Sequence, residues 1–266
     1  MIWPETVEVD PEDVLPPVVI EGWSIVRHGG ADKTTKKLVV KTAISSPETT
    51  VDVAGNTLGY VFDEASNVGT GGWVWQGALL MANYLTDKSV YGDNHFAGAS
   101  VLELGAGIGQ VALVLASIGA HVVATDRSLV LPLLQANLEN NAHRIPPSDL
   151  GGGSAVGAEL EWATDIVYNP DLLPPGSEKW DYILAADCLK CKEFVPLLHA
   201  TLLAYAHPET TIIFSYEERG LQALDVFRDA TQQDFAWSDI QGSPIAGNLS
   251  SGDRAIWSMT RTAPFP

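Results

Sequence analysis

The chain has 266 residues, of which 46% are hydrophobic, so it can form one large domain with a core, with or without a small extension. Its net charge of −18 opposes binding to the phosphate backbone of a nucleic acid. Only two cysteines are present and no apolar run reaches the ~18 residues of a bilayer-spanning helix, which excludes a disulfide scaffold and a membrane span. We expect a soluble cytoplasmic protein, with the nucleus as a second compartment.

The beginning of the chain predicts an acidic lead-in and a small β-rich extension. Residues 1–17 combine acids and prolines with little periodicity, which is typical of a poorly ordered segment. Residues 18–68 hold short β-like runs separated by turn residues, and we expect an antiparallel hairpin or small sheet from GWSIVRHG, KLVVKTAIS, TTVDVAG and GYVFDE. The main domain is predicted over residues 69–266, beginning with a glycine-rich break and an amphipathic helix in WVWQGALLMANYLTD.

The stretch VLELGAGIG, residues 101–109, predicts a buried strand, a glycine-rich turn and then a helix over 110–118. The next strand, HVVATD, ends in Asp126, about 20 residues past the glycines, where such folds place the acid that binds ribose hydroxyls. Gln110 stands where the dinucleotide pattern requires a third small residue. The turn therefore favours S-adenosylmethionine over a nicotinamide cofactor.

The rest of the chain alternates between strand and helix patterns. A helix is expected over 129–141 with Ser128 as its N-cap, and a flexible insertion over 144–157. Further strands are expected at 158–164, 180–189 and 210–218, with helices over 194–206 and 220–231. FAWSDI and AIWSMTR then follow with no helix between them, which predicts an antiparallel hairpin at the edge of an otherwise parallel sheet.

From about residue 71 to residue 261 the chain resembles the class I S-adenosylmethionine-dependent methyltransferases. Within that class it resembles the methyltransferase-like 21 group, part of protein-lysine methyltransferase family 16. The resemblance rests on GGWVWQGALLMANYL, VLELGAGIGQVALVLASIGAHVVATD, ELEW, DYILAADCLKCKEF and TIIFSYEER. It implies an α/β, Rossmann-like seven-stranded sheet, mostly parallel with an antiparallel last strand. It also implies S-adenosylmethionine as cofactor and lysine side chains of a protein as methyl acceptors.

Carried over residue by residue, the resemblance implies cofactor contacts at Trp75, Glu103, Gly105, Ala106, Gly107, Asp126, Trp162 and Ala186. Asp126 would accept from both ribose hydroxyls. The two tryptophans would offer aromatic faces to the adenine and methionine ends, with simple core packing as the alternative.

The acceptor is expected near Asp187, which takes the acid position of the family's D-x-x-Y motif and would orient a lysine ammonium. Lys190 replaces the tyrosine of that motif. It would either repel the incoming ammonium or point to solvent, leaving the aromatic role to Tyr216. For Tyr216 the alternative is a surface tyrosine at the end of a strand.

The expected partner is a folded, basic protein such as a translation factor or chaperone, attracted by the acidic surface, and the chain is expected to be a monomer. Neither a nucleic acid nor a membrane is expected as a partner. No metal is expected either, because Cys188 and Cys191 lack two further zinc ligands. The sequence also lacks the Asn-Pro-Pro-Tyr type of motif that is found in enzymes that methylate the exocyclic amines of nucleic-acid bases. Two alternatives stay open, a methyltransferase for small amines and a cofactor-binding interaction protein with little turnover.

Overall fold

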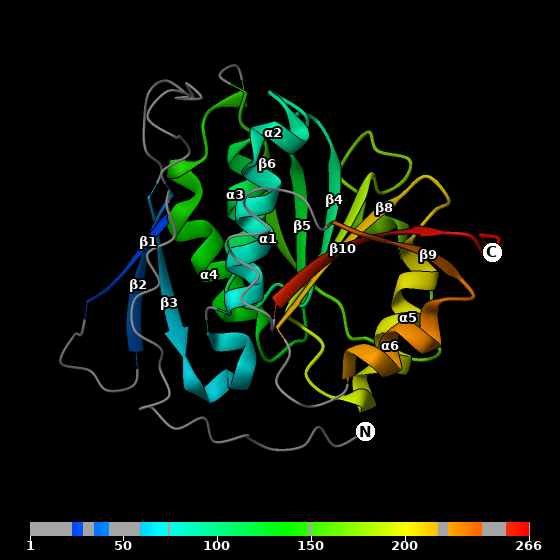
Figure 1. Ribbon diagram of the computed structural model, residues 1–266. Helices are drawn as coiled ribbons and strands as arrows, with labels where there is room; N and C mark the ends of the chain where they lie inside the picture. Colours follow the sequence, from blue (N-terminus) through cyan, green and yellow to red (C-terminus); the bar gives the residue numbers. More distant parts are fainter. Residues whose placement is uncertain are drawn as a thin grey trace.

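The computed structural model describes residues 23–28, 35–42, 59–73, 75–148, 151–217, 223–240 and 254–265 (Figure 1). Near the N-terminus, β1 (Trp23–His28), β2 (Thr35–Thr42) and β3 (Gly59–Ala65) form the expected antiparallel sheet. The predicted run TTVDVAG and the lead-in, residues 1–17, lie outside the described residues. The 3₁₀ helix η2 (Ser66–Gly72) then leads toward α1 (Gln76–Thr86), and β3 lies beside α4 (Leu131–Asn141).

The main sheet has seven strands in the order β6-β5-β4-β7-β8-β10-β9. The strands from β6 to β8 pair in parallel, whereas β10 lies between β8 and β9 and is antiparallel to both. The expected fold class and the antiparallel last strand are therefore confirmed. The strands are β4 (Ser100–Leu104), β5 (His121–Asp126), β6 (Ser154–Glu159), β7 (Tyr182–Ala186), β8 (Thr211–Glu217), β9 (Phe235–Asp239) and β10 (Arg254–Arg261).

Helices cover both faces of this sheet and enclose two hydrophobic cores (Figure 1). The first core holds α1, α3 (Gln110–Ser117) and α4, and the second holds α5 (Val195–Tyr205) and α6 (Ala223–Thr231). Every residue of β4 and of α3 is buried, which explains why both read as nearly continuous apolar runs. A short helix that the sequence did not indicate, α2 (Lys88–Tyr91), follows α1. None of the described helices is long and apolar enough to cross a membrane.

The start of β6 corrects the expected flexible insertion over 144–157 and the strand expected over 158–164. The strand begins at Ser154, and the two glycines directly before it pass unusually close to other backbone segments. A Cβ on Gly153 would lie 1.9 Å from the carbonyl oxygen of Ala120, and one on Gly152 would lie 1.7 Å from that of Pro146. This glycine run is therefore a tightly packed entry to an edge strand, and that strand ends at Glu159.

The start of α4 also differs from the expectation. Val130 occupies the N-cap position, and the helix begins at Leu131 with Pro132 in its first turn. Ser128, the expected N-cap, instead donates from its backbone amide and its hydroxyl to Glu161, at 3.3 and 3.5 Å. The proline provides the start signal that a capping hydroxyl would otherwise give.

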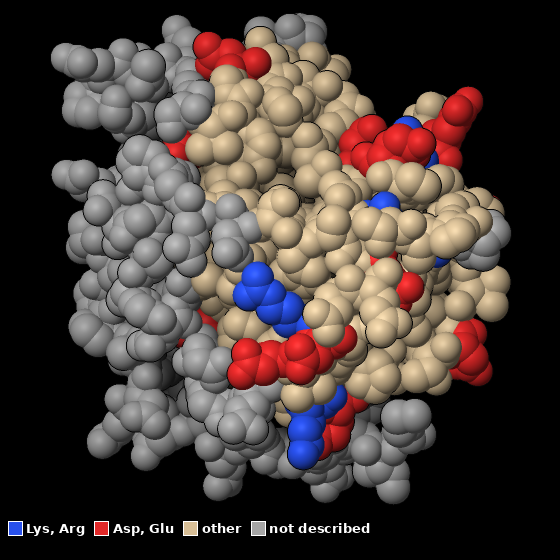
Figure 2. Space-filling model, turned by 45° about the vertical axis from the view of Figure 1, so that its right-hand side comes forward, with Lys and Arg blue, Asp and Glu red and all other residues tan. Residues whose placement is uncertain are grey.

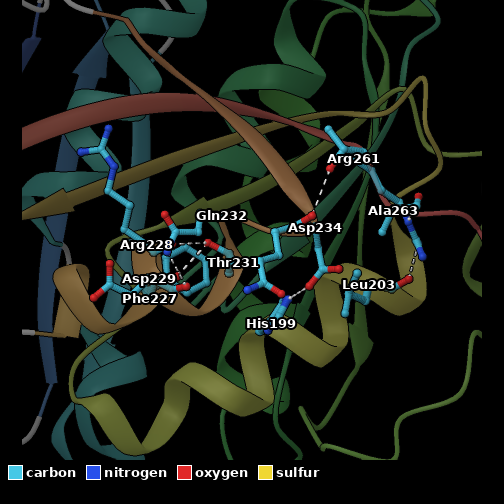
Figure 3. Close-up of polar contacts among 12 residues, drawn as sticks. His199, Leu203, Phe227, Arg228, Asp229, Thr231, Gln232, Asp234, Arg261 and Ala263 are labelled. Carbon is cyan, nitrogen blue, oxygen red and sulfur yellow. Dashed lines mark hydrogen bonds and ion pairs between the residues drawn. The ribbon is translucent and has the colours of Figure 1, made fainter.

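Arg261 fastens β10 to the C-terminal end of α5. Its guanidinium donates to the carbonyl oxygens of Leu203, Ala206 and Pro264 and, from Nε, to that of Ala263. Figure 3 shows this region. There, Nε2 of His199 on α5 lies 2.9 Å from Oδ2 of Asp234, a residue of the loop between α6 and β9. Charge-assisted bonds to the last carbonyls of a helix stabilise its C-terminus, so the end of the described chain and α5 are held together.

Candidate functional site

The predicted cofactor residues converge at the carboxyl ends of three adjacent strands. The glycine turn follows β4, Asp126 ends β5, and Asp187 follows β7. Since β4 lies between β5 and β7 and all three are parallel, these ends meet at one edge of the sheet. Open α/β sheets bind their ligands at such an edge.

The glycine turn holds the carboxylate of Asp126 in one orientation. The amide of Gly107 donates to its Oδ2 at 2.8 Å, and the amide of Arg127 donates to its Oδ1 at 2.9 Å. Burial raises the pKa of Asp126, while these two amides and the charges of Arg127 and Lys190 act in the opposite direction. Gly105 has a φ of 67°, and a Cβ there would lie 2.9 Å from that of Cys188. Only glycine fits this turn.

Glu103 and Gln110 bring unsatisfied polar groups to the same region. Both side chains are only 2% exposed, and within the described part of the chain neither Oε2 of Glu103 nor the Gln110 amide finds a hydrogen-bond partner. Burial raises the pKa of Glu103 to about 8; the backbone amide of Ala112, which donates a hydrogen bond to the carboxylate, acts against this shift, and the charge of Asp126 acts with it. Buried polar atoms of this kind are normally satisfied, so a ligand that carries hydroxyl or ammonium groups fits this site.

Asp187 joins the beginning of α1 to the ends of β7 and β8. Its Oδ2 accepts from the amide of Gly77 at 3.2 Å, and its Oδ1 accepts from the amide of Glu217 at 3.4 Å. The Ser215 hydroxyl donates to the carbonyl oxygen of Gly77, at 2.8 Å. Asp187 is 2% exposed and has a φ of 53°, a left-handed conformation that aspartate tolerates better than most residues. The sequence identified this acid but not its contact with α1.

Lys190 points into the site rather than to solvent. Its Nζ lies 5.3 Å from the centroid of the Trp75 ring, and Trp75 is itself oriented by its indole N–H, which donates to the carbonyl oxygen of Thr70 at 2.8 Å. Burial and the charge of Arg127 lower the pKa of Lys190 to about 8, against the opposing effect of Asp126, Cys188 and Asp187. Of the two alternatives expected for Lys190, the solvent-directed one is therefore wrong.

The remaining predicted residues divide into two groups. Trp162 lies beside the glycine turn, because a Cβ on Gly105 would come within 3.3 Å of its ring, and Ala106 and Ala186 are buried near the same strand ends. Tyr216 is 2% exposed and packs in the second core, 6.3 Å from the ring of Phe214. Its neighbour Ser215 faces α1, so Tyr216 projects from the opposite face of β8, and its aromatic role stays a prediction.

Sequence reasoning missed Arg127. Its guanidinium donates to the carbonyl oxygen of Val68 at 3.1 Å and lies 3.3 Å from where a Cβ on Gly69 would be. A carbonyl of the same glycine-rich segment, that of Gly71, would meet a Cβ on Gly107 at 3.1 Å. The glycine run before α1 was therefore the available signal, because it brings η2 against the cofactor turn. Across the described ranges, no group of three or more His, Cys, Asp or Glu is arranged to hold a metal ion.

The strand order, the glycine turn after β4 and the acids at the ends of β4, β5 and β7 define a Rossmann-like methyltransferase of class I. More narrowly, the chain belongs to the lysine methyltransferase family, whose model matches residues 56–234. The family implies S-adenosylmethionine as methyl donor, so the predicted cofactor is confirmed.

Several curated proteins are similar to this chain. EEF1A lysine methyltransferase 3 of Xenopus tropicalis is 29% identical over 172 residues, which are 64% of this chain and 69% of that protein. Protein-lysine methyltransferase METTL21E of Bos taurus is 33% identical over 177 residues, 65% of this chain and 56% of that protein. Protein N-lysine methyltransferase METTL21A of Xenopus tropicalis is 32% identical over 148 residues, 56% and 61% of the two chains. The chain thus spans between 56% and 69% of these relatives' lengths.

Proposed function

We propose that this chain transfers methyl groups from S-adenosylmethionine to lysine side chains of a protein. The observation that carries the proposal is Asp187, a buried carboxylate fixed at the end of β7 beside the cofactor turn, in a chain of the lysine methyltransferase family. When bound, S-adenosylmethionine supplies an electrophilic methyl group on a positively charged sulfur. The protein then has to align an amine with that methyl group and let it lose its proton.

The cofactor end of the site is assigned to residues of β4, β5 and the turn between them. Asp126 accepts the ribose hydroxyls, since the amides of Gly107 and Arg127 leave each carboxylate oxygen capacity for one further hydrogen bond. Glu103 takes a donor group of the ligand on its unsatisfied Oε2. Trp162 covers the turn from the side of Gly105 and packs against the adenine.

The acceptor end is assigned to Asp187 and Trp75. Asp187 orients the incoming lysine ammonium by charge, and Trp75 offers it an aromatic face, as it already does to Lys190. Exclusion of water from this buried corner favours the neutral amine, because desolvation lowers the pKa of an ammonium group. The pKa of Lys190, lowered to about 8 chiefly by burial in the same corner, supports this assignment.

The proposed substrate is a folded protein with a basic surface around the target lysine. The net charge of −18 supports this choice. Figure 2 shows a largely uncharged face on which acidic side chains gather along parts of the rim and a few Lys or Arg side chains also lie. Relatives named for EEF1A make a protein of that kind the first candidate. We propose that the chain acts as a monomer, and a small-amine acceptor remains the competing outcome of the test below.

The test combines radiolabelled S-adenosylmethionine, the purified chain and a methylation-deficient lysate separated on a gel. We expect a discrete labelled protein band that falls at least about 100-fold with Asp187→Asn, because misplacing the acceptor costs that much. Asparagine keeps a side-chain oxygen and tolerates the left-handed backbone. Asp181→Asn is the matched control, since Asp181 lies just before β7, at its opposite end, bonded to the Ser100 amide at 2.8 Å.

Calorimetry with S-adenosylhomocysteine separates binding from transfer in these variants. Cofactor binding should be equal in both, and the control variant should retain full transfer. A blank gel with normal cofactor binding would reject the protein acceptor in favour of a small amine or a binding protein without turnover. Full transfer by Asp187→Asn would reject the role assigned to Asp187.

A further inference from the structure

Lys190 experiences every condition that the site is proposed to impose on a substrate lysine. A lysine acceptor needs an aromatic surface, a nearby carboxylate and partial removal from water, so that its amine loses the proton. The Nζ of Lys190 lies 5.3 Å from the Trp75 centroid and is within the electrostatic influence of both Asp126 and Asp187. Its side chain is half-buried, whereas Lys192, two residues later, is exposed.

The backbone that carries Lys190 is anchored on both sides of the site. Asp187 is tied to α1 through Gly77, Cys188 packs against Gly105 of the cofactor turn, and Leu189 is fully buried. These anchors fix where the side chain begins, and the contact with Trp75 fixes where it ends. The long stem of Lys190 therefore spans the interval between the end of β7 and the N-terminus of α1, where Trp75 is the N-cap.

We propose that Lys190 is itself a methyl acceptor, modified within the same molecule by cofactor bound in this pocket. This inference rests on the proposed function, because it uses the same methyl donor. The lone pair of the neutral Nζ forms a bond to the methyl carbon, and the carbon–sulfur bond breaks with its electron pair going to sulfur. The proton leaves Nζ for solvent, and the products are N-methyl-Lys190 and S-adenosylhomocysteine.

The fraction of neutral amine supports this step. With a pKa of about 8, about a tenth of the Lys190 side chains are uncharged at pH 7, whereas an unperturbed lysine of pKa about 10.4 is almost wholly protonated. The positive sulfur of a bound cofactor would lower the pKa further, in the same direction as Arg127. Because Lys190 is attached to the site, no association step limits its reaction.

The test incubates the purified full chain with trideuteromethyl-labelled S-adenosylmethionine and maps the label by peptide mass spectrometry. We expect the labelled methyl group on Lys190, at a rate per molecule that does not change on tenfold dilution of the protein. Lys190→Arg should abolish the label, and the matched variant Lys192→Arg should leave it unchanged. Label at other lysines only, or a rate that rises in proportion to protein concentration, would overturn the proposal.

A second readout needs no turnover. Acetylation of the cofactor-free chain with acetic anhydride should modify Lys190 near neutral pH, and saturating S-adenosylhomocysteine should protect Lys190 but not Lys192. Equal acetylation of Lys190 with and without that ligand would also overturn the proposal, because the amine would then lie outside the pocket.

The proposed function and this inference fail in different ways. Calorimetric binding of S-adenosylhomocysteine together with lysate labelling, but no methyl on Lys190, rejects the inference and leaves the proposed function standing. Failure of the chain to bind S-adenosylhomocysteine at all rejects both.

Discussion

Gly77 is the position at which a single methyl group should most directly disturb the acceptor end of the site. It lies in the first turn of α1. Its amide donates to Oδ2 of Asp187 at 3.2 Å, and its carbonyl oxygen accepts from the Ser215 hydroxyl at 2.8 Å. A Cβ on Gly77 would lie 2.5 Å from Cβ and 2.8 Å from Cγ of Asp187. Real Cβ atoms do not approach so closely, so Gly77→Ala must push α1 away from the end of β7.

The expected loss of stability follows from three contributions. Overpacking in a buried position costs about 1–3 kcal/mol, and weakening the two buried hydrogen bonds costs about 1 kcal/mol each. The greater helix preference of alanine offsets about 1 kcal/mol. We therefore expect Gly77→Ala to lower the free energy of unfolding by about 2–4 kcal/mol, and lysine methylation to fall with it because Asp187 is displaced.

Urea unfolding of a double-mutant cycle tests this reasoning. Asp187→Gly removes the clashing Cβ and Cγ, so the cost of Gly77→Ala should fall by at least about 1 kcal/mol in that background. Ala78→Gly, at the next position of α1, reports the helix preference together with the loss of one partly buried methyl group. An equal cost of Gly77→Ala in both backgrounds would refute the steric explanation, and so would a variant as stable as the unmodified chain.

Two further predictions concern the cofactor end. Asp126→Asn should weaken S-adenosylhomocysteine binding by about 10- to 100-fold in calorimetry, because a side-chain amide cannot accept from Gly107, Arg127 and the ribose together. The control is Glu161→Gln, since Glu161 is exposed. Unchanged affinity of the Asp126→Asn variant would remove the ribose assignment. The second prediction concerns Glu103, whose pKa of about 8 in the folded state lies above its value of about 4.3 in the unfolded state. Between about pH 4.3 and pH 8 the folded state therefore binds more protons than the unfolded state, and the stability of the folded state falls as the pH rises. In urea unfolding of the cofactor-free chain, Glu103→Gln should lack this decline, and parallel pH curves for both proteins would contradict the buried-acid explanation.

The cofactor turn could be predicted from sequence because its information is local. Three glycines with positive φ follow one strand, and Asp126 ends the next, so the register of two parallel strands alone brings them together. The antiparallel last strand was predictable for a similar reason, since the sequence between the final two strands has no helical pattern. Patterns that depend on chain connectivity and short-range geometry survive without tertiary information.

Lys190 and β6 depended on tertiary contacts that no local pattern encodes. A lysine after a strand ordinarily reaches water, and it turns inward here because Trp75, distant in sequence, offers a ring. The glycine run at 151–153 is typical of a loose loop in sequence, since the close approach of Gly152 to Pro146 and of Gly153 to Ala120 is visible only in the folded chain. The contact of Asp187 with Gly77 is hidden in the same way.

The position of β10 constrains the order in which this protein can assemble during synthesis. β9 is made before β10, yet its only described strand partner is β10, which also supplies the second neighbour of β8. Until residues 254–261 have left the ribosome, β8 therefore exposes an open edge and β9 cannot join the sheet. Chains stalled before that point present the unpaired edge of β8 to other molecules, which favours aggregation of the incomplete protein.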